Sequence, residues 1–284
     1  MLKILKKFFY STVSVRLLSI GLNFLGSILV NRTLGLELRG EYTTVYTYAN
    51  LLQSIVNLGI IYAYVPFREK VGEEKAREVI SSLIWIQLIF CLLGSGVFLL
   101  ISFSLTNLFI CALMSAMVIN CQIVFLALIQ DIDYRNKVLL LCSAVYLLAN
   151  VVIYLFFDKA LYLILCCLIG KYLIEAFFCM KGGSIGPLHL QCLSWGDVLY
   201  VMRNGLPVLA ILITLNYNVD VILLNGLNAG DYEVGLFGVA YTLSNMLWFI
   251  PDAFKEYVFN RSARANISGL VLILVGANML ICAF

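Results

Sequence analysis

Long apolar stretches constrain this chain most, because each is long enough to cross a lipid bilayer as a helix. The hydrocarbon core is about 30 Å thick, which about 20 helical residues span. Hydrophobic residues make up 62% of the 284 residues and charged residues 12%, against about 45–50% and about 25% in soluble proteins. The sequence therefore predicts an all-α polytopic membrane protein with about nine spans, at residues 11–30, 43–65, 79–102, 108–130, 138–157, 161–180, 205–224, 234–254 and 266–284.

Positive charge is distributed unevenly between the two sets of loops. Of the 19 Lys and Arg residues, 14 fall on the side of the amino terminus, three on the opposite side and two, Arg16 and Lys171, inside spans. Because Lys and Arg accumulate in cytoplasmic loops, we expect a cytoplasmic amino terminus. No small-residue cleavage site follows the first apolar segment, so it is expected to stay as an anchor.

Two parts of the sequence resemble each other at an offset of 194 residues before residues 31–41 and of 195 after them, as Gly40 and Gly235 show. Residues 28–31 (Ile-Leu-Val-Asn) recur as 222–225 (Ile-Leu-Leu-Asn), and a Tyr-Thr pair follows each glycine. Such repeats are typical of transporters built from two similar bundles. We expect a six-helix lobe over residues 1–180, a cytoplasmic linker over 181–204, and the first three helices of a second lobe over 205–284.

Polar residues recur every three or four positions along several spans, which places them on one face of each helix. These stripes include Arg16 and Asn23 in the first span, Thr47 and Asn50 in the second, Ser143 and Asn150 in the fifth, and Tyr241 and Asn245 in the eighth. One interpretation is interhelical packing through small and hydroxyl residues. The other, favoured by the Asn and Arg side chains, is a water-filled cavity between the first, second, seventh and eighth spans.

Charged residues inside spans are candidate functional residues, since each costs about 2.5–3.5 kcal/mol or more at the bilayer centre. Lys171 lies about 15 Å into the sixth span at 1.5 Å per residue, with Glu175 one turn further on the same face. A structural ion pair and a substrate or proton site both remain open for these two. Arg16 lies near the inner end of the first span, and Asp220 near the outer end of the seventh, where a capping or interhelical hydrogen bond is the alternative.

Sequence motifs for catalysis and for cofactors are missing. The only histidine is His189, no Cys and His residues have metal-ligand spacing, and no glycine-rich phosphate loop occurs. Most of the nine cysteines lie in apolar spans, where we expect them to pack as small side chains. The loops are too short for the catalytic carboxylates of a membrane glycosyltransferase or polymerase. We therefore expect no enzyme, no cofactor or metal, and no nucleic-acid partner.

Two groups of residues resemble a known family. They are Arg32-x-Leu34-Gly35-x-x-x-x-Gly40-x-Tyr42 after the first span, and Gly205-x-Pro207, Asp220 and Gly235-x-Phe237-x-x-Ala240 around the seventh and eighth spans. This pattern resembles the polysaccharide (Wzx-type) flippases of the multidrug/oligosaccharidyl-lipid/polysaccharide exporter superfamily. The resemblance implies two six-helix lobes around a cationic cavity. It also implies movement of polyprenyl-pyrophosphate-linked oligosaccharides, the repeat units of O-antigen or capsule, across the bacterial inner membrane.

The resemblance assigns roles to some of the charged residues. Arg16 and Lys171 would bind the pyrophosphate or sugar carboxylates, and Asp220 would be the recurring acidic residue of the seventh helix. We expect Asn23, Asn50 and Asn245 to complete the substrate site. Membrane lipid is an expected partner, together with a polysaccharide polymerase or a complementing second half of the transporter.

Two other outcomes remain open at this stage. A cation-coupled multidrug antiporter of the same superfamily would need buried carboxylates in the first lobe, where Glu175 alone is available. Family members have twelve or more helices, whereas about three of the second lobe's six are found in this sequence. The sequence therefore also predicts a truncated or split flippase that inserts but does not transport by itself.

Overall fold

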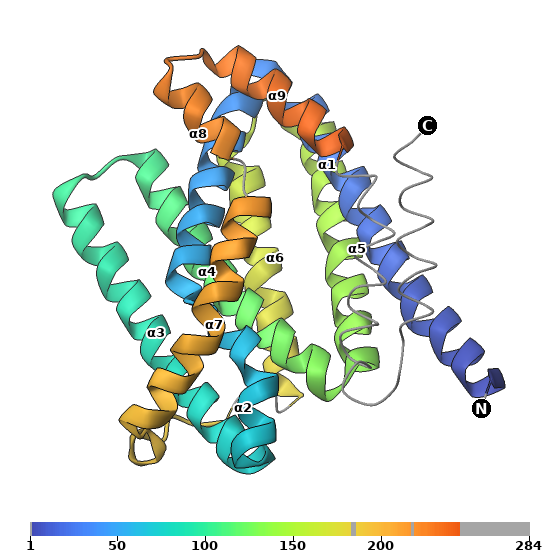
Figure 1. The fold of residues 1–284 in the computed structure, drawn as a ribbon. Helices are drawn as coiled ribbons and strands as arrows, with labels where there is room; N and C mark the ends of the chain where they lie inside the picture. The colour runs from blue at the N-terminus through green and yellow to red at the C-terminus, as the bar shows by residue number, and fades with distance from the viewer. Residues whose placement is uncertain (1, 183–185, 217–218, 245–284) are drawn as a thin grey trace.

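The protein is an all-α polytopic membrane protein. The computed structural model describes residues 2–182, 186–216 and 219–244 (Figure 1), and no strand occurs among them. Its helices are α1 (Leu2–Asn57), α2 (Tyr64–Val71), α3 (Glu73–Ile101), α4 (Leu105–Gln130), α5 (Ile132–Phe156), α6 (Leu161–Lys181), α7 (Trp195–Asn216), α8 (Val219–Gly226) and α9 (Asp231–Ser244), with short 3-10 turns at Ile60–Ala63 and Leu190–Cys192. Within these ranges, five helices are long and apolar enough to cross a membrane: Ser14–Asn57 of α1, α3, α4, α5 and α6.

Gly35 divides α1 into two arms. Its φ of 69° and ψ of −178° interrupt the helix, and a residue without a Cβ adopts this conformation most easily. The 44 residues of Ser14–Asn57 would extend about 66 Å as one straight helix, far more than one bilayer crossing. Figure 1 shows the first arm rising from the amino terminus to α9 and the second arm descending from there. The turn expected over residues 31–41 is therefore helical on both sides of a single bend.

The boundaries of two other expected spans also differ from the prediction. The second span, expected to end at residue 65, ends at Asn57, because Leu58 and Gly59 follow with positive φ angles of 49° and 70°. In addition, α7 begins at Trp195 instead of residue 205. Ser194 caps this helix by accepting a hydrogen bond from the backbone nitrogen of Asp197 at 3.1 Å, as serines at the start of a helix commonly do. The end of the expected linker is thus helical.

The main core lies where α1, α3, α4 and α6 meet. Fully buried apolar side chains from these helices include Val45, Ile80, Leu113 and Ile164. The first arm of α1 packs on α5, and α4 packs on α6. On the outer side of this core, many large apolar residues of α3 and α5 are exposed, as expected of surfaces that face lipid.

A glycine-mediated crossing joins α9 to the bend of α1. The backbone at Gly40 lies against Asp231, the backbone at Gly235 lies against Leu36, and Gly238 lies against Thr43. At the 195-residue offset, the Gly40–Asp231 and Gly235–Leu36 contacts correspond to each other with their partners exchanged, and the Gly238–Thr43 contact corresponds to itself. This reciprocity is the pattern expected where two repeated elements cross about a two-fold axis, and it supports the internal repeat seen in the sequence. The remainder of the eighth span and the whole ninth span lie outside the described residues.

Candidate functional site

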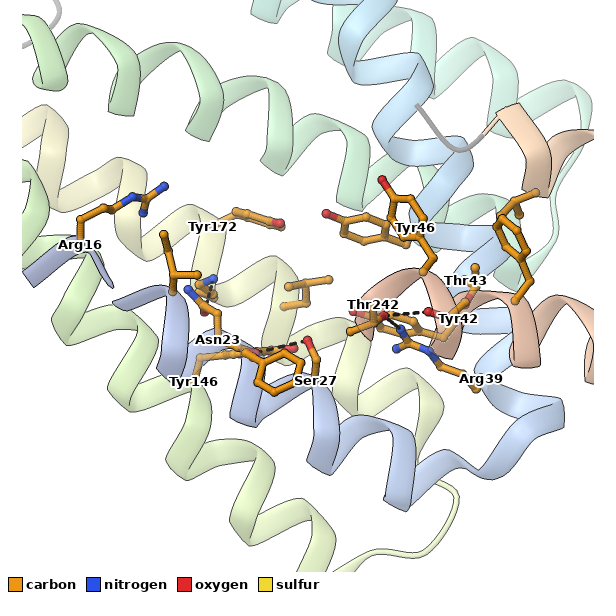
Figure 2. A pocket seen from close by; sticks show the side chains of 18 residues that line it. Arg16, Asn23, Ser27, Arg39, Tyr42, Thr43, Tyr46, Tyr146, Tyr172 and Thr242 are labelled. Carbon is orange, nitrogen blue, oxygen red and sulfur yellow. Dashed lines mark hydrogen bonds between the residues drawn. The ribbon is translucent and has the colours of Figure 1, made fainter. Parts of the chain in front are cut away.

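A cavity of about 320 Å³ lies between both arms of α1 and the helices α5, α6, α8 and α9 (Figure 2). The sequence predicted a cavity between the first, second, seventh and eighth spans, and the structure adds α5 and α6 to its walls. The lining combines cations, tyrosines and small polar groups. Its residues are Arg16, Ile20, Asn23, Phe24, Ser27, Arg39, Tyr42, Thr43, Tyr46, Tyr146, Leu168, Lys171, Tyr172, Val221, Phe237, Gly238, Tyr241 and Thr242.

Lys171 reaches the cavity from the middle of α6. Its Nζ donates a hydrogen bond to Asn23 Oδ1 at 2.8 Å, and it lies 5.2 Å from the ring centre of Tyr146 and 5.5 Å from that of Tyr172. Aromatic faces attract a cation electrostatically. These contacts hold the ammonium group beside the cavity.

Glu175 neutralises part of the Lys171 charge from outside the cavity. Its carboxylate lies 3.7 Å from Lys171 Nζ and accepts a hydrogen bond from Asn120 Nδ2 at 2.9 Å. The Glu175 residue is only 4% exposed and does not line the cavity. Of the two alternatives that the sequence left open for Lys171 and Glu175, the ion pair is present, and Lys171 also belongs to the cavity wall.

The polar stripes of α1 and α5 pack directly against each other next to the cavity. Ser19 and Ser143 share a hydrogen bond of 2.9 Å, and Asn23 Nδ2 donates to Ser143 Oγ at 3.0 Å. Gly26 allows the Tyr146 ring to approach the first arm of α1 closely. The two interpretations of the stripes therefore both apply, since small polar residues join the helices and Asn23 reaches from that contact to the cavity.

Arg39 is a cavity residue that sequence reasoning missed, because it was assigned to an outer loop. It is only 7% exposed, and its Nη2 donates to Thr242 Oγ1 at 3.1 Å. The guanidinium carbon lies 4.7 Å from the ring centre of Tyr42. No carboxylate in the described part of the chain pairs with Arg39, and its buried Nε has no hydrogen-bond partner there. Its i, i+3, i+7 spacing with Tyr42 and Tyr46 would have identified it, had this segment been recognised as helical.

The other predicted site residues divide into three groups. Arg16 and Asn23 line the cavity with Lys171, as expected. Asn50 and Asp220 do not line it: the backbone oxygen of Asn50 accepts a hydrogen bond from Ser54, and Asp220 is exposed on α8 while its neighbour Val221 faces the cavity. Asn245 lies outside the described residues.

The cavity has a strongly positive character. Figure 2 shows Arg16 and Arg39 toward opposite ends, with Asn23, Ser27 and Tyr146 between them. Three cations and no carboxylate occur among its lining residues, and no group of His, Cys, Asp and Glu within the described ranges has the arrangement of a metal site. Such a lining suits an extended anionic ligand with hydroxyl groups. Comparisons of the chain with protein-family models, curated proteins and solved structures find no match.

Proposed function

We propose that this protein moves polyprenyl-pyrophosphate-linked oligosaccharides across a bacterial inner membrane. The observation that carries the proposal is a cavity among membrane-spanning helices whose lining contains Arg16, Arg39 and Lys171 but no carboxylate. Charge-assisted hydrogen bonds to phosphate are about twice as strong as neutral ones. An intramembrane cation facing a polar cavity is costly for a protein, and an anionic substrate offsets that cost.

The aromatic lining supports a sugar as the neighbouring group. Five tyrosines line the cavity: Tyr42, Tyr46, Tyr146, Tyr172 and Tyr241. A tyrosine provides an apolar ring face for the C–H groups of a sugar and a hydroxyl that both donates and accepts hydrogen bonds. Tyr42 and Tyr46 stack at a centroid distance of 6.3 Å, which gives one wall an extended flat surface.

The same lining gives little support to a cation-coupled antiporter. A coupling cation requires oxygen ligands or a carboxylate that exchanges protons. Glu175, whose carboxylate lies 3.7 Å from the cavity residue Lys171, is already engaged by Lys171 and Asn120. A positive cavity would repel both a cationic drug and its coupling ion, so we favour the anionic lipid-linked glycan.

Alternating access supplies the mechanism of this proposal. Transporters with internal repeats move one bundle against the other around a central site, and here α1 and α9, one from each repeat, both line the cavity. The positive-inside pattern supports a cytoplasmic amino terminus. Reporter fusions test it: a fusion at Glu73 should report a cytoplasmic location and one at Asn228 an external location, and the reverse pattern would refute this orientation.

The substrate test compares two lipid-linked glycans that differ only in charge. The purified protein in nanodiscs should bind the pyrophosphate-linked glycan at least about tenfold more tightly than an uncharged glycolipid with the same sugars, and the difference should shrink with salt. Arg16→Gln should weaken binding of the charged ligand, since a hydrogen bond to a charged group is worth about 1.5–3 kcal/mol. Arg32→Gln, on the exposed side of α1, is the control. Equal affinity for both ligands would overturn the proposal.

A further inference from the structure

A second cavity, of about 250 Å³, lies between α5 and α6. Its lining is apolar except for Tyr146 and Lys171. The α5 wall comes from Leu141, Cys142, Val145, Tyr146 and Ala149, and the α6 wall from Cys167, Gly170, Lys171, Ile174 and Phe178. We call this space the α5–α6 groove.

The rim of the α5–α6 groove faces lipid. Leu141, Val145 and Ile174 on the rim are 60%, 54% and 45% exposed, and both helices are long and apolar enough to cross the membrane. Exposed apolar side chains at this depth contact hydrocarbon and not water. The groove is therefore reached laterally from the bilayer.

Tyr146 and Lys171 belong to both cavities. Lys171 Nζ lies 5.2 Å from the Tyr146 ring centre and is hydrogen-bonded to Asn23 on the polar side. These two side chains thus stand between a cationic, tyrosine-lined space and an apolar space open to lipid. A single ligand that occupied both spaces would need an anionic head, an apolar chain and a junction between them at Lys171.

We propose that the α5–α6 groove binds the polyprenyl chain of the same lipid-linked glycan whose pyrophosphate contacts Lys171. This inference rests on the function proposed above and adds the path of the chain. A head group in the cavity would lie between the helices of the bundle, so the chain must leave between two helices to stay in the membrane. The groove offers that exit next to the cation that would hold the phosphate, and its position orients the substrate in the cavity.

The test uses photo-crosslinking in nanodiscs, because every lipid chain partitions into a bilayer and an affinity measurement would not distinguish the groove from bulk lipid. One probe is a polyprenyl-pyrophosphate-linked glycan with a diazirine on the isoprene unit next to the phosphate. A second probe carries the diazirine on its sugar, and a third is phosphatidic acid with a diazirine on its acyl chain. Crosslinked peptides are identified by mass spectrometry.

The chain probe should label α5 and α6 around Val145 and Ile174 at least about tenfold more than the lipid-facing side of α3, where Phe90, Leu93 and Val97 are similarly exposed. The phosphatidic acid probe should show no such preference. Even labelling of all three helices by the chain probe, or an equal preference shown by phosphatidic acid, would overturn the assignment of the groove to the polyprenyl chain.

Two matched glycine variants locate the chain within the groove. A Cβ at Gly170 or at Gly94 meets no neighbouring atom within 4 Å, so Leu should be accommodated at both, and it favours helix more than Gly does. Gly170→Leu fills the groove and should reduce chain labelling of α5 and α6 at least about tenfold, whereas Gly94→Leu on α3 should not. Ala149→Leu, from the facing helix, should act as Gly170→Leu does.

The sugar probe separates this inference from the proposed function. It should label the cavity segments of α1 equally in the wild type, Gly170→Leu and Gly94→Leu. If the sugar probe labels the cavity but Gly170→Leu and Ala149→Leu leave chain labelling unchanged, the groove assignment fails and the proposed function stands. If the sugar probe does not label the cavity of the wild type, the proposed function fails and the groove assignment fails with it.

Discussion

Replacing Arg39 by glutamine separates a substrate-binding arginine from a structural one, because the two roles predict opposite changes in stability. Arg39 is 7% exposed and has no carboxylate partner in the described part of the chain. Its Nη2 donates a hydrogen bond to Thr242 Oγ1 at 3.1 Å, and a glutamine amide retains a donor for that hydroxyl. A buried charge without a carboxylate partner is costly in a membrane, so its removal should not destabilise the ligand-free protein.

In contrast to stability, the affinity of Arg39→Gln for the glycan should fall. If Arg39 contacts the pyrophosphate or an acidic sugar, the lost hydrogen bond to a charged group is worth about 1.5–3 kcal/mol, or about 10-fold to 150-fold in dissociation constant. We therefore expect Arg39→Gln to keep or raise the thermal unfolding midpoint and to weaken binding of the pyrophosphate-linked glycan by at least about tenfold.

Differential scanning fluorimetry of the purified protein gives the unfolding midpoint, and titration in nanodiscs gives the dissociation constant. Arg32→Gln is the matched control, since Arg32 is exposed on the same helix and should change neither quantity. A variant Arg39→Gln that unfolds several degrees earlier and still binds the glycan as the wild type does would refute this reasoning. Arg39 would then be a residue that joins α1 to α9.

Three further perturbations test the packing and the charges. Gly235→Ala places a Cβ onto the Leu36 backbone and should lower the free energy of unfolding by about 1–3 kcal/mol. The control Gly21→Ala should be tolerated, because its Cβ meets no atom within 4 Å. Equal unfolding midpoints for the two variants would exclude the close α1–α9 crossing. Lys75 on α3 lies 2.9 Å from the carboxylate of Asp197. The hydrogen bond from Lys75 lowers the pKa of Asp197 below its usual range. The stabilisation that this ion pair gives should therefore be complete above the unfolded-state pKa of about 3.9. It should disappear as the pH falls through the lower folded-state pKa of Asp197. Asp197→Asn should reduce the difference between unfolding midpoints at neutral and strongly acidic pH, and an unchanged difference would contradict this assignment. Lys171→Met should destabilise the protein by up to about 3–5 kcal/mol, because it leaves the Glu175 carboxylate buried without its cation. Adding Glu175→Gln should restore the unfolding midpoint but not glycan binding. Restored binding in the double variant would show that Lys171 is not a ligand contact.

The sequence by itself determined the fold class and part of the site. Apolar stretches of bilayer length admit few structures other than helices, because backbone groups in lipid must satisfy their hydrogen bonds within the segment. The cost of an intramembrane charge singled out Arg16 and Lys171, and helical spacing added Asn23. All three line the cavity. Each of these inferences depends only on local length, spacing and charge, which a linear sequence contains.

Only the tertiary structure decided which faces meet. Arg39 is buried because α1 continues as a helix past Gly35 and because α9, with Thr242 203 positions along the chain, covers it. Tyr146 and Tyr172 became cavity walls through the packing of α5 and α6 on α1, whereas Asp220 lies on the exposed side of α8. The direction of a side chain depends on the rotation of its helix about its own axis. Contacts between distant segments, such as the glycine crossing of α1 and α9, set that rotation, and they cannot be derived from the spacing within one helix.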